Sequence, residues 1–230
     1  MSGGCVGPRT CTVLRFHRRL EMTLYSYIVA QDGGFAPNPF FGYCTLACCK
    51  PGIRKHATPG DWIVGLSPKS DGYRVVYYMK VDDVIPFHQY WKRFRRKRPN
   101  VNGNLKQKNG DNIYEPKVGG FLGYRQLPSA HSKSKFKSGE DREKMMRDLN
   151  GDHVLISRHF AYFGSEPRDL SSRIMERLRV GRGYRHLPED IVEAFQKEVR
   201  RQGWTFGVHA KPRKWNEDDQ SWKGSTCGGK

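Results

Sequence analysis

The sequence has no long hydrophobic run. No stretch approaches the roughly 18 consecutive apolar residues of a membrane-spanning helix, so we expect none of it to cross a membrane. It also lacks the glycine-rich dinucleotide fingerprint, the GxxxxGK[ST] phosphate loop, and the HExxH and GxSxG motifs. Because these common cofactor and hydrolase signatures are missing, we predict neither a cofactor nor a metal.

Cysteine pairs with the spacing of metal ligands are missing as well. Cys44, Cys48 and Cys49 lie close together, but no CxxC pair occurs. The first residues contain no continuous apolar segment of the secretory kind. We therefore expect a reducing, cytoplasmic location in which these cysteines are small buried side chains.

Acidic residues are scarce relative to basic ones. The 230 residues include 41 Lys and Arg against 23 Asp and Glu, which gives a formal net charge of +18. Such a charge favours a polyanionic partner. No basic amphipathic helix with a bulky apolar face stands out, which makes a membrane surface the weakest choice. We expect the partner to be nucleic acid, with DNA favoured, or a nucleotide, and not a membrane.

Composition divides the chain into three parts. Residues 1–21 carry arginines without an apolar core, and we expect a disordered extension there, with Met22 as an alternative start. Residues 22–210 have enough apolar side chains to form one folded domain. We expect residues 211–230 to be a basic, flexible tail.

Hydrophobic periodicity predicts more strands than helices. Strands are predicted at residues 23–30, 60–66, 73–85, 152–164 and 204–210. Helices are predicted at residues 86–94, from Ser138 to about residue 150, and at 187–203. Residues 92–112 are basic and nearly free of apolar side chains, which is typical of a long irregular loop. This order predicts an α+β fold class with a curved, mostly antiparallel sheet and flanking helices.

The segment 32–55 is rich in glycine and proline but is not of low complexity. Asp32 is followed by two glycines, which allow the backbone to approach a ligand closely. Phe35 and Asn38 lie among prolines, and a stacking ring beside a carboxylate and an amide would cradle a base. The alternative, which we weigh equally, is an ordered loop whose Phe side chains close the end of a barrel.

Several cations and polar groups near this segment are candidates for binding a nucleotide. Lys50 and Arg54 would pair with phosphate, and Arg54 is the stronger candidate because its planar guanidinium fits a phosphate group. The alternative for both is a solvated turn. A second loop at 102–116 combines a cation, a carboxylate, an amide and an aromatic ring in Lys106, Asp111, Asn112 and Tyr114. That loop would hold a nucleotide or, as the alternative, lie flexibly on a phosphate backbone.

Four segments together resemble a known family: YSYIVAQDGGFAPNPFFGYCTLACCKPGIRKHATPGDWIVG, VVYYMKVDDVIPFHQYW, NGDNIYEP and HVLISRHFAYFG. They are similar to the nucleotide-modification-associated domain, second type, of phages and bacteria, over roughly residues 22–165. The resemblance implies an association with systems that modify bases in DNA, and its polar motif residues hint at enzymatic activity without specifying a reaction. The family pattern marks Asp32, Gly34, Phe35, Ala36, Pro37, Asn38, Pro39, Thr45, Lys50, Arg54, Gly60, Asp61, Trp62, Asp111, Asn112, Tyr114, Ser157, Phe160 and Gly164.

A second likeness concerns architecture. The segment ATPGDWIVGLSPKSDGYRVVYYMKVDDVIPFHQYW is similar to the centre of PUA-like domains of the EVE and ASCH kind. The likeness implies a PUA-like β-barrel with flanking helices and a cleft that receives a modified base. In that cleft, Phe35 and Trp62 would form an aromatic wall, Asp32 and Asn38 would read the base edge, and Arg54 would hold a phosphate.

Three functional hypotheses follow. The first is a protein that binds modified bases in DNA or modified nucleotides. The second is an enzyme that transfers or removes a group on a base or nucleotide, with Asp32 and Asp111 as general base or metal ligand. The third is a basic interaction protein without pocket chemistry. The enzyme hypothesis predicts that Asp32 and Asp111 converge on one ligand atom, and the binding hypothesis predicts one carboxylate beside an aromatic wall.

Overall fold

The computed structural model describes residues 21–137, 139–151 and 153–215 of the chain. The extension expected over 1–21 lies outside the described residues, apart from Glu21, and so does the expected tail beyond residue 215. Ser138, at which a helix is expected to begin, is outside them as well.

The strands form three sheets. Sheet A has the spatial order β10 (Tyr184–Leu187), β1 (Leu24–Ile28), β3 (Trp62–Leu66), β4 (Val75–Lys80), β9 (His159–Tyr162) and β11 (Gly207–Val208). Sheet B has the order β2 (Cys44–Leu46), β8 (His153–Ser157) and β5 (Asp83–Pro86). The third sheet is the hairpin of β6 (Tyr114–Phe121) and β7 (Tyr124–Gln126).

The described helices are mostly short. The α-helices are α1 (Pro51–His56), α2 (Phe87–Arg93), α3 (Leu105–Lys108), α4 (Arg142–Leu149), α5 (Ser172–Leu178) and α6 (Glu189–Arg201). Two 3-10 helices, η1 (Lys69–Asp71) and η2 (Arg95–Lys97), lie in connections. No helix in the described ranges is long and apolar enough to cross a membrane.

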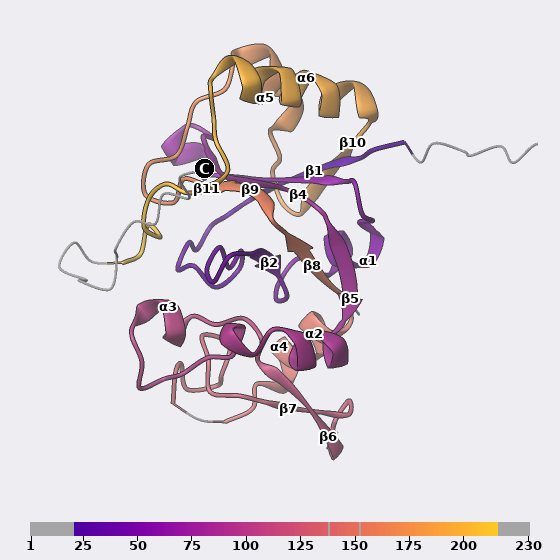
Figure 1. Cartoon of the computed structure of the whole chain (residues 1–230), viewed down its shortest axis with the longest axis vertical. Helices are drawn as coiled ribbons and strands as arrows, with labels where there is room; N and C mark the ends of the chain where they lie inside the picture. The colour runs from indigo at the N-terminus through magenta and orange to yellow at the C-terminus, as the bar shows by residue number, and fades with distance from the viewer. Residues whose placement is uncertain (1–20, 138, 152, 216–230) are drawn as a thin grey trace, which may run out of the picture.

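The elements stack in four layers, which Figure 1 shows from top to bottom. Helices α5 and α6 cover one face of sheet A, and sheet B packs against the other face. Helices α2 and α4 and strand β6 cover the opposite face of sheet B. Each of the three interfaces has its own hydrophobic cluster, so sheets A and B are buried on both faces. For this reason the residues on both faces of their strands are mostly apolar.

Two long strands bend from sheet A into sheet B at the same level. β4 pairs with β9 in sheet A, and their continuations β5 and β8 pair in sheet B. Asp82 holds the bend, because its carboxylate accepts the backbone N–H of Arg158 and lies 2.7 Å from His159 Nδ1. The single strands predicted at 73–85 and 152–164 are therefore each two strands.

Helix α6 supplies most of the apolar surface of the outer helical layer. Pro188 precedes it, acidic residues occupy its first turn and arginines its last, as the helix macrodipole favours. Its buried side chains each contribute about 1.5–3 kcal/mol by burial against sheet A: Ile191, Val192, Phe195 and Val199. The helix predicted at 187–203 is thus confirmed.

The predicted α+β class is confirmed, with antiparallel pairs dominating. Sheet A is mixed, because β1 pairs with β3 in parallel and β9 with β11 in parallel, while its other neighbours are antiparallel. Among the described residues the strands do not close into a barrel, since β10 and β11 end sheet A on opposite edges. The expected PUA-like barrel is therefore wrong. The bend places the continuations of β4 and β9 in sheet B, and sheet A stays open.

Candidate active site

A tight turn between β2 and α1 presents a cysteine. Cys49 and Lys50 both have left-handed backbone conformations, with φ of 62° and 43°, and Pro51 then begins the helix. Such conformations cost about 1–3 kcal/mol each in non-glycine residues and are kept where the surroundings enforce them. The turn is fixed on both sides, because the Cys49 N–H donates to Asp148 Oδ1 at 2.8 Å and Arg54 Nε donates to the Cys49 carbonyl at 2.8 Å. The half-buried Cys49 side chain thus has a defined position.

Cys49 is the first member of a chain of three polar side chains. Its Sγ lies 3.5 Å from Nε2 of His131, and Nδ1 of the same ring lies 2.7 Å from Oδ2 of Asp148. His131 and Asp148 are buried, so the sulfur is the most accessible of the three. A nucleophile, a base and a group that orients the base, connected in this order, form the arrangement by which enzymes activate a thiol.

The charges of this triad support one another. Burial by itself lowers the pKa of His131, but its hydrogen bonds with Asp148 and Cys49 outweigh that effect and raise the pKa to about 9. Burial would raise the pKa of Asp148, yet the bond to His131 and the nearby Arg54 guanidinium hold it below its ordinary value. At neutral pH the pair is therefore an imidazolium and a carboxylate. The Cys49 sulfur therefore lies 3.5 Å from a positively charged ring.

Three of the residues that the sequence singled out hold this triad in place. Arg54 is completely buried, and its guanidinium donates to the carbonyls of Cys49, His153 (2.8 Å) and Asp148. The Tyr114 hydroxyl donates to Asp148 Oδ2 at 2.8 Å. The ring of Phe35 packs against the ring of His131 with centroids 4.7 Å apart.

The buried arginine also explains a glycine. A Cβ added to Gly151 would lie 2.5 Å from the Arg54 guanidinium, which is closer than such contacts occur. Arg54 therefore fills the space beside Gly151, and in this structure its donors are used by the protein and do not face solvent. We interpret Arg54 as the anchor of the cysteine turn, in contrast to the surface phosphate contact that its guanidinium suggested.

Cys48 lies beside the triad and raises the question of a metal. Its sulfur, one ring nitrogen of His131 and one oxygen of Asp148 lie within 4.8 Å of one another. However, Cys48 Sγ contacts the Asp111 carbonyl at 3.7 Å, and burial raises the pKa of the Cys48 thiol well above its ordinary value. The Asp148 carboxylate already accepts from three donors. Because these groups satisfy one another as hydrogen-bond partners, we interpret the cluster without a metal.

A second buried polar cluster surrounds Asp111. Thr45 and Tyr90 donate hydroxyl hydrogen bonds to its two oxygens, both at 2.7 Å. Burial raises the pKa of Asp111, although the nearby Lys97 ammonium opposes this effect. Lys97 is itself buried, donates to both oxygens of Asn38 at 2.7–2.8 Å, and has its pKa lowered to about 8 by burial. This cluster ties the proline-rich loop to α2 and the basic segment after it.

Asp32 occupies a third position, at the end of β1. The Tyr162 hydroxyl and the Arg213 N–H donate to its two carboxylate oxygens, and burial raises the pKa of Asp32. Trp215 Nε1 donates to the Gly33 carbonyl at 3.0 Å, so the first residues of the expected tail pack on this loop. Asp32 and Asp111 share none of these hydrogen-bond partners.

The structure separates the remaining predicted binding residues. Trp62 packs against Tyr78 and Phe195 on the α6 side of sheet A, whereas Phe35 belongs to the cluster beneath sheet B. These two rings therefore do not form one aromatic wall. Asn112 donates to the Tyr90 and Phe94 carbonyls.

The two predicted phosphate-binding lysines differ in position. Lys50 follows Cys49 directly, donates to the Gly183 carbonyl at 3.3 Å and lies over the Tyr27 ring. Burial lowers its pKa. Lys106 is half-buried on α3, in the loop region that precedes Asp111. Of the predicted cations, Lys50 is therefore the one whose backbone adjoins the triad.

Sequence reasoning missed all three members of the triad. His131 lies 82 residues after Cys49, and Asp148 a further 17 residues on, so no short motif contains them. The only local signal is the turn itself, in which two adjacent cysteines stand between a predicted loop and Pro51. That pattern is consistent with a strand–turn–helix nucleophile, but it is not specific.

Comparison with known proteins agrees with the resemblance noted in the sequence. A family model described as nucleotide modification associated domain 2 matches residues 21–219, which extends the likeness well beyond residue 165. No curated protein and no solved structure matches the chain significantly. The matched range includes all three sheets, every described helix and all three triad residues. The chain therefore belongs to the nucleotide modification associated domain 2 family.

Proposed function

We propose that this protein is an enzyme of a nucleotide modification system, in which Cys49 forms a transient covalent bond with an acyl group carried by a base or nucleotide. The observation that carries the proposal is the connected series Cys49, His131 and Asp148 on a strained, half-buried turn. Family membership supplies the nucleotide context. The triad supplies the reaction class, since thiol, imidazole and carboxylate in this order serve acyl transfer.

The chemistry needs no reactant besides water. The Cys49 thiolate attacks the acyl carbon, a C–S bond forms, and the bond from that carbon to the nucleotide nitrogen or oxygen breaks as His131 Nε2 gives it a proton. The neutral imidazole then removes a proton from water, whose oxygen attacks the thioester. The C–S bond breaks, and the products are a carboxylic acid, the free nucleotide group and the regenerated thiolate–imidazolium pair.

Cations near the triad fit an anionic substrate. Lys133, Lys135 and Lys137 are exposed and follow His131 within six residues. Lys50 follows Cys49 directly in the sequence. Interactions of this kind attract phosphate groups at long range and position them at short range. They favour a nucleotide or nucleic-acid substrate over a neutral one.

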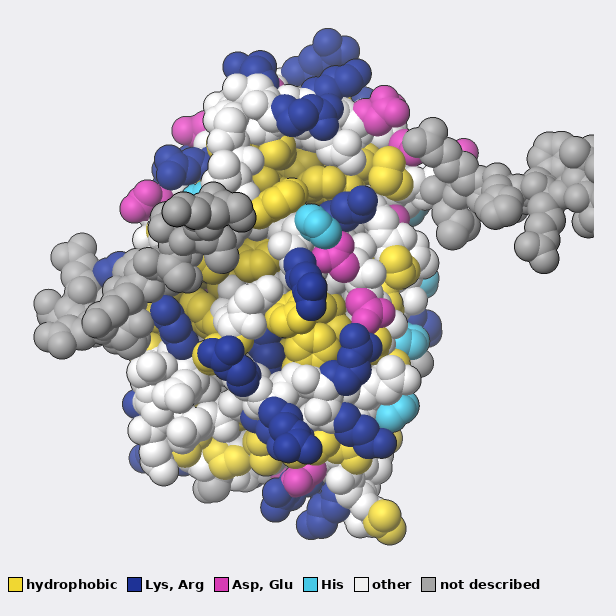
Figure 2. All heavy atoms as spheres, in the orientation of Figure 1, with side chains coloured by type: hydrophobic (Ala, Val, Ile, Leu, Met, Phe, Trp, Pro, Cys, Tyr) yellow, Lys and Arg dark blue, Asp and Glu magenta, His cyan; other side chains and the backbone are white. Residues whose placement is uncertain are grey.

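A second surface favours nucleic acid as the form of the substrate. Arg96 lies over the Phe41 ring at 5.2 Å, and Arg158 lies over the Tyr43 ring at 5.0 Å. Tyr43 in turn contacts Phe94, and Phe41 contacts Phe40. Figure 2 shows Lys and Arg side chains interspersed with hydrophobic ones over the half of the molecule that carries α2 and α4. Cations over aromatic rings are typical of single-strand and base-stacking surfaces, and we propose DNA as the polymer.

A protein that only binds modified bases is the alternative, and the same cationic surface favours it. Its predicted pocket loses support from the burial of Asp32 and Asn38 and from the separation of Phe35 and Trp62. The third hypothesis, an interaction protein without chemistry, leaves unexplained why a strained turn, a buried arginine and an imidazolium–carboxylate pair all converge on one sulfur.

The decisive experiment uses mass spectrometry to detect acylation of the protein. The protein is incubated with p-nitrophenyl acetate and with N-acetylated deoxycytidine monophosphate, free and within an oligonucleotide, and the modified peptide is identified. We expect one acetyl group on Cys49, absent in Cys49→Ala and retained in Cys48→Ala, whose buried thiol serves as the matched control. His131→Gln should slow the reaction by about 100-fold or more. Equal labelling of wild type and Cys49→Ala, or an unchanged rate in His131→Gln, would refute the mechanism.

A further inference from the structure

A cavity lies between sheet A and the C-terminal part of α6, and none of its lining residues belongs to the triad. It has a volume of about 370 Å³. The residues that matter for its chemistry are Trp62 on β3, Lys80 on β4, Gln196 and Arg200 on α6, and Trp204 and Phe206 after α6. A cavity of this size, with aromatic walls and a few polar groups, is typical of a small-molecule site.

One wall of this cavity is a buried indole. The Trp62 indole is 93% buried, being 7% exposed, and its Nε1–H has no hydrogen-bond partner among the described residues. The neighbouring Tyr78 hydroxyl is also buried without a partner in that part of the chain. Tyr78 stacks between Trp62 and Trp204, at centroid distances of 5.9 and 6.2 Å. Both polar atoms have essentially no accessible surface, so neither faces the cavity, and Trp62 presents ring surface to it.

The remaining walls define the class of that ligand. Trp204 is half-buried and Phe206 is 48% exposed, so both present ring surface to a flat partner. Lys80 and Arg200 form no ion pair with any described residue, although both line the cavity. His159, which also lines it, is held by Asp82 and by the edge of the Phe206 ring. A flat ring with an anionic substituent satisfies the aromatic and cationic groups together.

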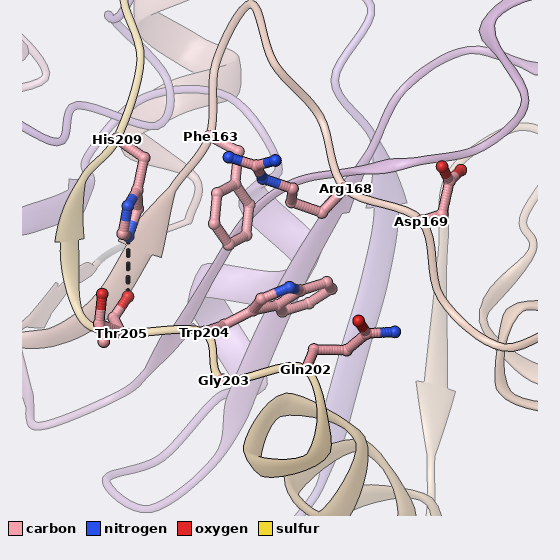
Figure 3. A pocket seen from close by; sticks show the side chains of 8 residues that line it. All are labelled: Phe163, Arg168, Asp169, Gln202, Gly203, Trp204, Thr205 and His209. Carbon is pink, nitrogen blue, oxygen red and sulfur yellow. Dashed lines mark hydrogen bonds between the residues drawn. The ribbon is translucent and has the colours of Figure 1, made fainter.

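Trp204 is held in place from its other side. Figure 3 shows its indole beneath the Phe163 ring, with Arg168 reaching over Phe163 and His209 beside it. The Phe163 and Trp204 rings meet edge to face at 5.1 Å, and His209 stacks on Phe163 at 5.0 Å. A separate cavity of about 500 Å³ opens there. The Trp204 indole thus lies between two cavities and is held in place by Phe163, so it offers a fixed surface on which a flat ring can stack.

The geometry points to a second nucleotide-binding site at this cavity. The base stacks on Trp204 and Phe206, Gln196 pairs with the base edge, and Lys80 and Arg200 hold the phosphate. The site is independent of the acyl-transfer proposal, because it shares no residue with the Cys49 site.

Calorimetric titration of the full chain tests the site. The probes are the four deoxynucleoside 5′-monophosphates, the matching nucleosides, inorganic phosphate and a short single-stranded oligonucleotide. Phe206→Leu removes an exposed stacking ring, and it should weaken nucleosides and nucleotides alike by about tenfold. Arg200→Gln should weaken nucleotides by about tenfold and leave nucleosides unchanged. Lys197→Gln, an exposed cation on the same helix outside the cavity, is the matched control and should change neither.

The outcomes separate the possibilities. Nucleotide binding that both variants weaken supports the site, and tighter oligonucleotide binding with the same losses assigns the ligand to a base within a strand. No binding of any probe at millimolar concentration, or equal weakening by Lys197→Gln and Arg200→Gln, overturns it. Because Phe206 and Arg200 are both exposed, each variant remains informative if the other does not fold. Cys49→Ala should bind as wild type does, so failure of the acyl-transfer proposal leaves this test intact.

Discussion

Replacing His131 by glutamine should change how the stability of the protein depends on pH. The His131 pKa is raised from 6.5 to about 9 in the folded chain, chiefly by Asp148 against the opposing effect of burial. Each unit of difference between folded and unfolded pKa corresponds to about 1.4 kcal/mol, so the protonated ring contributes on the order of 3 kcal/mol to the free energy of unfolding. The contribution is not reduced by solvent screening, since the ring is 9% exposed.

The sign follows from the direction of the shift. Because the folded pKa lies above the unfolded one, the stabilisation is fully present below pH 6.5 and is lost as the pH rises through about 9. Lys97 acts in the opposite direction: burial lowers its pKa from 10.5 to about 8, so it makes the protein more stable as the pH rises from 8 towards 10.5. The two effects partly cancel above pH 8. A plot of wild-type stability against pH therefore does not separate the contribution of His131 from that of Lys97.

The measurement is therefore a difference between two proteins. Urea unfolding of wild type and His131→Gln is followed from pH 6 to pH 9.5 in the presence of a reductant, and the free energies are subtracted at each pH. We expect the wild-type advantage to shrink by about 3 kcal/mol between pH 6.5 and 9, because Lys97 contributes equally to both proteins. Parallel curves across this range would refute the imidazolium–carboxylate pair.

Three further perturbations probe the surroundings of the site. Gly151→Ala should lower the free energy of unfolding by about 1–3 kcal/mol in urea titrations, because its Cβ would meet the Arg54 guanidinium at 2.5 Å; an unchanged midpoint would contradict the close contact. Asp111→Asn should lower the free energy of unfolding by about 1–3 kcal/mol, because the amide nitrogen cannot accept the hydroxyl hydrogen bond that one carboxylate oxygen now accepts; an unchanged midpoint in urea would contradict these bonds. Arg96→Gln should reduce the slope of log affinity against log salt for single-stranded DNA by about 0.7, whereas an identical slope would place the strand elsewhere.

The parts of the fold that the sequence predicts are those decided by local periodicity. Helix α6 and strands β1 and β3 were predicted because their apolar spacing and end residues are unambiguous within a few residues. The bend at Asp82 was not, since an uninterrupted run of β-branched and aromatic residues carries no sign of a change of sheet. Strand β10 pairs with β1 through a segment rich in glycine and arginine, and only tertiary pairing makes it a strand.

The site was harder to predict than the fold, because burial reverses the usual meaning of polar residues. Arg54 resembles a surface phosphate ligand in sequence, since arginine is almost never fully buried unless it is paired. Here it is buried with three carbonyl partners, and only the folded chain brings those carbonyls together. Cys49 was expected to be a buried structural cysteine, and its half-buried position becomes apparent only from the turn geometry.

The polar residues of the first motif serve the triad more than they serve stability. A buried charge pair is weak support for a fold, because desolvation offsets most of its attraction and apolar residues of similar volume often stabilise more. The buried guanidinium of Arg54 nevertheless donates to the backbone of the cysteine turn and to the carbonyl of Asp148. Tyr114 donates a hydrogen bond to the Asp148 carboxylate. These bonds fix the separation between the sulfur and the carboxylate that orients the imidazole. A requirement for that geometry accounts for burying a guanidinium, a carboxylate and an imidazole beside a strained turn, where packing alone would favour apolar side chains.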